Sequence, residues 1–308
     1  MIPGIWFVAI LAFSVTLLGG MMMHAGLVIQ AGNLAFAAIA SSLLIPATIR
    51  YGVRNADTIA KTRLKDFSEH CLLMTAFILL GVIASYPVAA ASSGFADAKL
   101  ARADALLRFD WVSWYAFVAR YPLLQQFGAA AYATIYISPV ILLGYLARTG
   151  QRASARQFLA AFWLAALLTL FLFPLMPAKG PLAFLWQGSI PYMPTSALYQ
   201  AEIIPELRDH VFTMIDLGAL RGLVCAPSAH SACAVLYIVT AWRFRPLRWV
   251  LIPLNIAMLL SIPVEGTHYL TDMLMGATVA LAAIMLVKYA SQLLVREPLN
   301  RTALTVSV

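Results

Sequence analysis

Residues 157–176 read QFLAAFWLAALLTLFLFPLM, a run without a single charged side chain. About 20 apolar residues are what an α-helix needs to cross the hydrocarbon core of a bilayer. The rest of the chain repeats this pattern, because 62% of its 308 residues are hydrophobic and only 11% are charged. Soluble domains carry about 25% charged residues. The sequence therefore predicts an all-α polytopic membrane protein and argues against a large soluble core.

About eight transmembrane helices are predicted along the chain. They cover roughly 3–23, 26–48, 71–92, 122–147, 157–176, 224–242, 249–265 and 268–288. The division between the first two is the weakest, because only Met21 to Gly26 could form the turn. We expect one membrane domain, with about three helices in 1–93, an external segment in 94–121, a helical core in 122–290 and a cytoplasmic tail in 291–308.

The basic residues divide unequally between the two sides of these helices. Fourteen Lys and Arg lie in one set of loops and at the C-terminal end, and seven lie in the other set. Cytoplasmic loops carry the excess of basic residues. Both termini are therefore predicted to be cytoplasmic, in an inner or plasma membrane. The same distribution accounts for the net charge of +8 without a nucleic-acid partner.

Two long segments are predicted on the outer side. In 94–121, the residues Leu100, Leu107, Trp111, Trp114 and Val118 share one helical face, which predicts an interfacial helix on the outer leaflet. That helix could anchor the protein or guide lipid to a site. The second segment, 177–223, is rich in Pro and Gly, and loops of this length are often functional.

Two histidines stand where predicted helices begin. His230 lies in CAPSAHSACA (225–234), directly after Pro227 and Ser228. His268 opens the last predicted helix and is followed four residues later by Asp272. Both helices run inward by the charge rule, so both histidines are predicted at the outer membrane boundary.

Helix N-termini at this boundary suit an anionic group, because their N–H groups are unpaired and carry partial positive charge. Ser228 is expected to cap its helix or to donate to an oxygen. His268 and Asp272, at i and i+4, are expected to share a helix face. The carboxylate can then fix the tautomer of the imidazole, which leaves the other ring nitrogen free as a base or nucleophile.

Two other interpretations of these residues stay open. His268 and Asp272 could be a buried polar pair that only holds helices together, and two His with one Asp could bind zinc. The chain has no HExxH motif, so no metal is expected, although Glu265 keeps the metal interpretation open. The three cysteines, Cys71, Cys225 and Cys233, have no metal-binding spacing and are expected to be free thiols.

Three stretches resemble motifs of the type-2 phosphatidic acid phosphatase superfamily, which also contains vanadium haloperoxidases. Residues 227–230, PSAH, resemble its PSGH motif, and residues 266–272, GTHYLTD, resemble its final His and Asp motif. Residues 176–181, MPAKGP, stand where the superfamily has its Lys-containing and Arg-Pro-containing phosphate motif. The resemblance covers about 95–290. It implies a six-helix phosphatase-like core and places catalysis in 122–290.

The chain departs from this pattern at three places. Ala229 replaces the Gly of PSGH, Ile262 stands where an Arg is usual, and Lys179 lacks the Arg-Pro pair. The variant pattern is similar to the branch that includes inositol phosphorylceramide synthases, which transfer a phospho-head group between lipids. Arg221 could supply the missing positive charge or could be an ordinary interfacial arginine.

The resemblance also implies a role for each site residue. His268 would attack phosphorus and form a phosphohistidine, Asp272 would orient it, and His230 would protonate the departing oxygen and activate the second nucleophile. Phosphate would be bound by Lys179, Arg221 and Ser228. No metal, nucleotide or other cofactor is expected.

Three functions are compatible with the sequence. The favoured one is a lipid phosphatase at the outer membrane face, acting on a phospholipid phosphate or a polyprenyl diphosphate. The second is a lipid phosphotransferase, in which an alcohol replaces water as the acceptor. The third is a non-enzymatic transporter, which is disfavoured because the ionisable residues gather at one boundary instead of at several depths.

Overall fold

The computed structural model describes residues 2–304, with side chains described up to residue 293. Seven of its helices are long and apolar enough to cross a membrane, which confirms the predicted all-α class. They are α1 (Gly4–Ala25), α2 (Leu34–Gly52), α3 (Ile59–Ala90), α6 (Pro122–Arg148), α7 (Arg152–Leu172), α11 (Arg245–Glu265) and α12 (Leu270–Leu304). The remaining predicted span, the sixth at 224–242, corresponds to the shorter apolar helix α10 (Ala229–Ala241).

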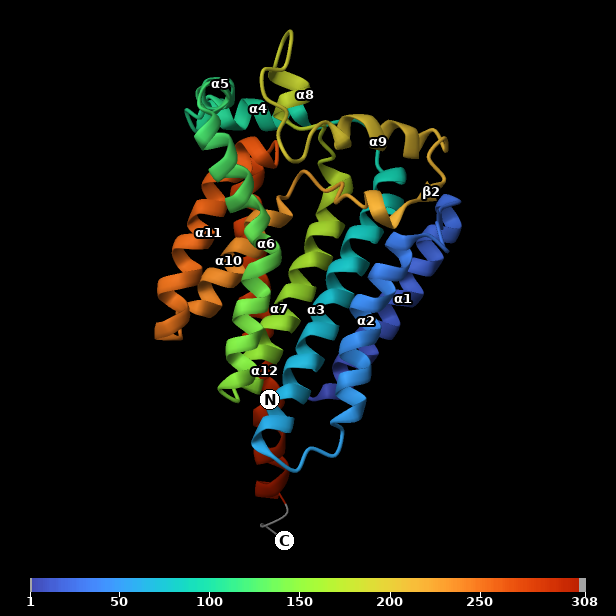
Figure 1. Cartoon of the computed structure of the whole chain (residues 1–308), viewed down its shortest axis with the longest axis vertical. Helices are drawn as coiled ribbons and strands as arrows, with labels where there is room; N and C mark the ends of the chain where they lie inside the picture. Colours follow the sequence, from blue (N-terminus) through green and yellow to red (C-terminus); the bar gives the residue numbers. More distant parts are fainter. Residues whose placement is uncertain (1, 305–308) are drawn as a thin grey trace.

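The long helices form one bundle. In Figure 1, α11 lies at one edge and α1 at the other, with α10, α6, α7, α3 and α2 between them. Interlocking large side chains from several helices fill the centre, and Phe77, Leu142, Leu159 and Tyr237 are each at most 2% exposed. α2 has no buried residue, as expected for a helix that faces lipid on most sides.

One end of the bundle carries a layer of short elements, which we call the cap and define as residues 94–121 and 177–223. It contains α4 (Asp97–Leu106), α5 (Trp111–Arg120), α8 (Pro181–Leu185), α9 (Tyr199–Arg208), η2 (Leu217–Ala219) and β2 (Met214–Ile215). η1 (Phe173–Leu175) leads into it from α7. The end of α12 points the opposite way (Figure 1).

The first two helices are separated differently from the prediction. α1 runs to Ala25, and Gly26 takes the left-handed conformation that ends it. The next residues form the short strand β1 (Val28–Ile29), which pairs in parallel with β2 of the cap. Because the backbone of β1 forms hydrogen bonds with the cap, the second helix begins at Leu34 and not at residue 26.

The third helix begins twelve residues earlier than predicted, at Ile59 instead of residue 71. Its first turns carry charged residues, which is why hydropathy alone placed them in a loop. Asp66 pairs with Arg152, and Glu69 pairs with both Arg50 and Arg156. These ion pairs at the end opposite the cap let a charged segment continue a membrane helix. The predicted tail is also helical as far as Leu304, and residues 305–308 lie outside the described part.

The single interfacial helix predicted over 94–121 is two helices, α4 and α5. The chain breaks between them where Arg108 has a φ of 57°, and Asp110 caps α5 by accepting from the amide of Ser113. The apolar residues expected on one helical face therefore do not form one buried surface. Leu107, for example, is 50% exposed. α4 instead buries Asp97, Leu100 and Asp104 against the bundle.

Candidate active site

His268 and Asp272 form a buried pair at the start of α12. The Nδ1 atom of His268 lies 3.0 Å from Oδ1 of Asp272, and the two side chains are 3% and 0% exposed. His268 precedes the helix, which begins at Leu270, so the expectation of a shared helix face is wrong in detail. Asp272 lies in the first turn, and its Oδ2 accepts from the amide of Tyr269. One carboxylate therefore stabilises the helix start and orients the imidazole.

Ser228 and His230 occupy the corresponding place on α10. Ser228 is the N-cap residue, because its hydroxyl accepts from the amide of Ser231 at 3.3 Å. The hydroxyl is thus engaged in capping its own helix. His230 follows in the first turn, and both it and Ala229 line a cavity.

Backbone and glycine contacts hold the two helix starts together. The amide of Ser228 donates to the carbonyl of Asp272 at 3.0 Å. The hydroxyl of Ser231 donates to the carbonyl of Met273 at 2.7 Å. Gly276 makes this approach possible, because a Cβ atom there would overlap the carbonyl oxygen of Ser228. The two motifs, about forty residues apart in sequence, thereby become one site.

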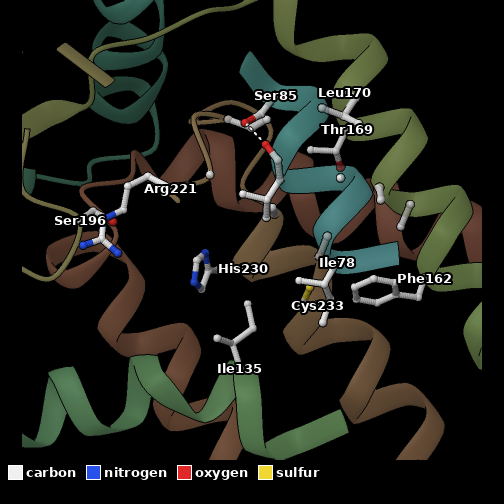
Figure 2. Close-up of a pocket in the computed structure, with 18 of the residues that line it drawn as sticks. Ile78, Ser85, Ile135, Phe162, Thr169, Leu170, Ser196, Arg221, His230 and Cys233 are labelled. Carbon is white, nitrogen blue, oxygen red and sulfur yellow. Dashed lines mark hydrogen bonds between the residues drawn. The ribbon is translucent and has the colours of Figure 1, made fainter. Parts of the chain in front are cut away.

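A cavity of about 260 Å³ opens beside these residues. His230 and His268 both line it, together with Arg221, Ser196 and the aromatic ring of Tyr132. Figure 2 shows His230 with Arg221 and Ser196 to one side of it, and with Ile78, Phe162 and Cys233 to the other. The cavity therefore has a polar end at the cap and an apolar part between the helices.

Tyr132 of α6 packs directly on His230. The two rings are stacked with their centroids 4.1 Å apart, and the Tyr132 hydroxyl lies 3.2 Å from Nδ1 of His230. The same hydroxyl lies 3.3 Å from Oγ of Ser196 in the cap. This contact occupies Nδ1, which leaves Nε2 of His230 to exchange a proton with a bound group.

Glu265 holds the cap segment that presents Ser196. Its fully buried carboxylate accepts from the hydroxyl of Tyr192 and from the amide and hydroxyl of Thr195. The Ser196 amide also donates to the Glu265 carbonyl at 2.8 Å. Burial and the adjacent carboxylate of Glu265 raise the pKa of the Tyr192 phenol, so that phenol stays protonated and donates. Each carboxylate oxygen of Glu265 thus accepts a hydrogen bond from the cap. Glu265 does not belong to the group of potential metal ligands around His268 and Asp272.

Lys179 lies in a loop that the cap helix α4 positions. Asp97 of α4 accepts from the amides of Lys179 and Gly180, and from the hydroxyl of Tyr269. Gly180 has a φ of 91°, and a Cβ atom there would lie 2.9 Å from the Thr267 carbonyl, so the loop packs tightly beside His268. The Lys179 ammonium, however, lies 4.8 Å from the centre of the Phe95 ring, and Lys179 is not among the residues that line the cavity.

Arg221 reaches the cavity that Lys179 does not. Its guanidinium lies 4.8 Å from the centre of the Tyr199 ring, and its amide donates to the hydroxyl of Tyr86. Figure 2 shows the guanidinium beside Ser196, to one side of His230. The position of the missing family arginine, Ile262, is fully buried against Tyr132 and Met273.

A group of three potential metal ligands occurs at the site. One ligand atom each from Cys225, His268 and Asp272 lies within 4.8 Å of the other two, and all three residues are buried. Both Asp272 oxygens already accept hydrogen bonds, from His268 and from the amide of Tyr269. The Cys225 sulfur lies 3.7 Å from Asp272 Oδ2. This set could hold a soft divalent ion only by replacing the contact that orients His268.

Several residues that build the site belong to none of the motifs recognised in the sequence. The sequence led to no expectation for Asp97 or Asp104, yet Asp104 accepts from the amides of Leu270 and Thr271 and so caps α12. Their spacing of seven residues, with Leu100 between them, was the available signal for one buried helix face. Tyr132 and Gly276 carried no signal of their own within apolar helices.

Seven helices of membrane-spanning length define an integral membrane protein. His230 and His268, which line one cavity, form a candidate site for phosphoryl transfer. Residues 98–286, more than half of the chain, match a family model described as the PAP2 superfamily. The chain belongs to this superfamily. Its members are phosphoesterases, which supports a hydrolase or phosphotransferase role. Comparison with curated proteins finds no match, and comparison with solved structures finds none either.

Proposed function

We propose that this protein is a lipid phosphatase that hydrolyses a lipid phosphate monoester or diphosphate through a phosphohistidine. The observation that carries the proposal is that His268, oriented by Asp272, and His230, stacked on Tyr132, line one cavity. A nucleophile with an orienting carboxylate and a separate proton donor are the groups that two-step phosphoryl transfer requires. The apolar part of the same cavity favours a lipid substrate over a soluble one.

In the first step, Nε2 of His268 attacks phosphorus and forms a P–N bond while the P–O bond to the lipid alcohol breaks. Nδ1–H of His268 donates to Asp272, whose carboxylate stabilises the charge that develops on the ring. His230 transfers a proton to the departing oxygen. In the second step, His230 takes a proton from water, the resulting hydroxide attacks phosphorus, and the P–N bond breaks to release phosphate.

The charge of the transferred phosphoryl group needs neutralisation in both steps. We assign this role chiefly to Arg221, which lines the cavity and takes the place of the arginine that Ile262 replaces. The first turn of α10, beginning at Ser228 and Ala229, contributes partial positive charge. Lys179 is a second cation near the site, and its contribution requires its ammonium to move away from Phe95.

The proposed orientation places the cap and the active site outside and both termini in the cytoplasm. The excess of Lys and Arg in the loops at the opposite end supports this arrangement. Substrate would then be drawn from the outer leaflet of an inner or plasma membrane. An accessible thiol or epitope placed in α9 and labelled in intact cells measures this orientation directly.

A lipid phosphotransferase is the second candidate. The hydroxyls of Tyr132, Thr195, Ser196 and Tyr199 all belong to residues that line the polar end of the cavity, where an alcohol acceptor could bind in place of water. The chemistry up to the phosphohistidine is the same for both functions. The difference lies only in which hydroxyl His230 deprotonates in the second step.

The deciding experiment incubates the purified full-length protein with labelled phosphatidic acid, phosphatidylglycerol phosphate and a polyprenyl diphosphate, with and without candidate acceptor alcohols. Free phosphate as product supports the phosphatase, and a new phosphodiester lipid supports the transferase. Release by the wild type and none by His268→Ala is required for either. If no substrate is turned over and His268→Ala still complements the loss of the gene in cells, the enzymatic proposal fails and a transporter becomes the better interpretation.

A further inference from the structure

A second, smaller cleft lies at the end of the bundle opposite the cap. It is formed by α7, α10 and α12, which pack against one another. Two exposed basic residues line it, because Arg243 follows the end of α10 and Lys288 belongs to α12. Phe158 and Val287 line its apolar part. The cleft shares no lining residue with the cavity beside His230, so it is a separate site.

The two cations of the cleft have no carboxylate partner among the described side chains. The described carboxylates at this end of the bundle are already paired with other basic residues, as Asp57–Lys61, Asp66–Arg152, Glu69–Arg50 and Glu69–Arg156. No ion pair within the described side chains involves Arg243 or Lys288. Two positive charges that share one cleft without a counter-charge favour an anionic ligand.

Polar groups inside the cleft are also available to a ligand. Ser154, Gln157 and Thr240 line it, and the side chains of these three residues make no hydrogen bond within the described part of the chain. Ser154 lies in the first turn of α7, where the helix carries partial positive charge. The Trp242 carbonyl at the end of α10 would repel an anion, but it already accepts two hydrogen bonds from the guanidinium of Arg248.

We infer that this cleft binds the phosphate head group of an anionic phospholipid in the leaflet opposite the cap. The phosphate lies between Arg243 and Lys288, and the lipid beyond it lies against Phe158 and Val287. A lipid is favoured over soluble phosphate, because the cleft lies between membrane helices and joins cations to apolar side chains. Basic pockets of this kind between membrane helices bind anionic head groups. In the proposed orientation this is the cytoplasmic leaflet, where anionic lipids are found.

The position of the cleft gives the bound lipid a consequence for the rest of the bundle. α10 and α12 carry His230 and Asp272 at their other ends. Hydrogen bonds join the two helices there, from Ser228 and Ser231 of the first to the main chain of the second. A lipid held by both α10 and α12 adds a link at the opposite end. Bound lipid should therefore raise the melting temperature without taking part in the chemistry.

The first test titrates the purified full-length protein, freed of lipid in a neutral detergent, with phosphatidylglycerol or phosphatidylcholine of the same acyl chains. Native mass spectrometry counts the bound lipids. One phosphatidylglycerol should bind about thirtyfold more tightly than phosphatidylcholine, which is the combined effect of two nearby cations. It should also raise the melting temperature, whereas inorganic phosphate should not. Equal affinity for the two lipids, or the same stabilisation by inorganic phosphate, would overturn the inference.

The matched variants remove two charges each from the same end of the bundle. Arg243→Gln with Lys288→Gln should reduce the affinity for phosphatidylglycerol to that for phosphatidylcholine. Arg63→Gln with Arg148→Gln is the control, because these two exposed residues do not line the cleft, and it should bind as the wild type. Equal weakening in both pairs would show a diffuse attraction to the basic surface and no defined site.

A third variant tests the polar groups at constant net charge. Gln157→Leu with Thr240→Val keeps both cations and removes the side-chain donors, so the affinity for phosphatidylglycerol should fall at least about tenfold. The melting temperature measured without lipid shows whether each variant is folded. A folded Gln157→Leu and Thr240→Val variant with full affinity would contradict a head group seated inside the cleft.

A photoreactive group near the glycerol of phosphatidylglycerol locates the lipid independently of turnover. Crosslinked peptides should contain residues 154–161 or 284–288. Crosslinks to 195–200 instead would place the lipid in the cavity beside His230 and overturn the inference. Because binding alone is measured, a protein that hydrolyses no lipid phosphate would refute the proposed phosphatase and leave this site standing.

Discussion

The amide of Ser228 donates a hydrogen bond of 3.0 Å to the main-chain carbonyl of Asp272. This bond joins the first turns of α10 and α12, which carry His230 and the partner of His268. Because Gly276 has no side chain, the two backbones come close enough to form this bond, which fixes the height of one helix relative to the other. The distance between the two candidate catalytic histidines is therefore a property of helix packing.

Replacement of either histidine should give a different kinetic result. His268→Ala removes the attacking nitrogen, so neither product nor labelled enzyme should form. His230→Ala should lower turnover by about 10²- to 10⁴-fold, because the general acid and base is lost. With a substrate whose leaving group needs no protonation, His230→Ala should accumulate radiolabelled phosphoenzyme that is stable to alkali and labile to acid. Labelled phosphoenzyme in His268→Ala would show that another residue is the nucleophile.

Gly276→Ala should separate the two motifs. The added Cβ atom would overlap the Ser228 carbonyl oxygen, so α10 and α12 must move apart. We expect a lower melting temperature and a large loss of kcat. Gly19→Ala is the matched control, because its Cβ atom would meet nothing within 4 Å, and it should change neither quantity. Equal behaviour of the two variants would show that the close approach is unnecessary.

Tyr132→Phe should leave the stacked ring in place and remove only the hydroxyl near Nδ1 of His230. A single hydrogen bond contributes roughly 0.5–1.5 kcal/mol, so kcat/KM should fall up to about tenfold. Because the tautomer and basicity of His230 depend on this contact, the pH profile of kcat should shift as well. Ser196→Ala, which removes the outer partner of the same hydroxyl, should have a smaller effect. An unchanged profile in Tyr132→Phe would limit Tyr132 to packing.

Arg221→Ala should weaken phosphate binding more than Lys179→Ala. Arg221 lines the cavity, whereas the Lys179 ammonium lies over Phe95 outside the lining. Loss of a charged hydrogen bond costs roughly 1.5–3 kcal/mol, which corresponds to a decrease of about ten- to hundredfold in kcat/KM. Arg221→Lys should recover part of it. The reverse order of the two alanine variants would identify Lys179 as the principal phosphate ligand.

Chelation of metal ions should leave the activity unchanged. The proposed chemistry uses nitrogen and oxygen atoms of the protein alone, and a metal on Cys225, His268 and Asp272 would occupy the nucleophile. Cys225→Ala should remain active, and added zinc should inhibit the wild type more strongly than this variant. Loss of turnover with EDTA, restored by one particular divalent ion, would reverse this assignment.

Much of the fold could be predicted from hydropathy and charge, because a bilayer requires long apolar helices whose backbone hydrogen bonds are formed within each helix. The ends of the helices did not follow in the same way. Residues 59–70 look like a loop by charge, yet they are helical because Asp66 and Glu69 meet arginines from other helices. Residues 28 and 29 look like part of a span, yet they pair with the cap.

The sequence by itself determined the class of protein, and it singled out His230, His268 and Asp272 as the candidate reactive groups. Each motif consists of residues close together in the chain, and the residue types indicate which reactions they can support. The tertiary structure alone decided which basic residue reaches the cavity, that Tyr132 stacks on His230, and that Asp97 and Asp104 support the site from the cap. These relationships join residues far apart in sequence through helix packing, and a pattern read along one chain does not contain those contacts.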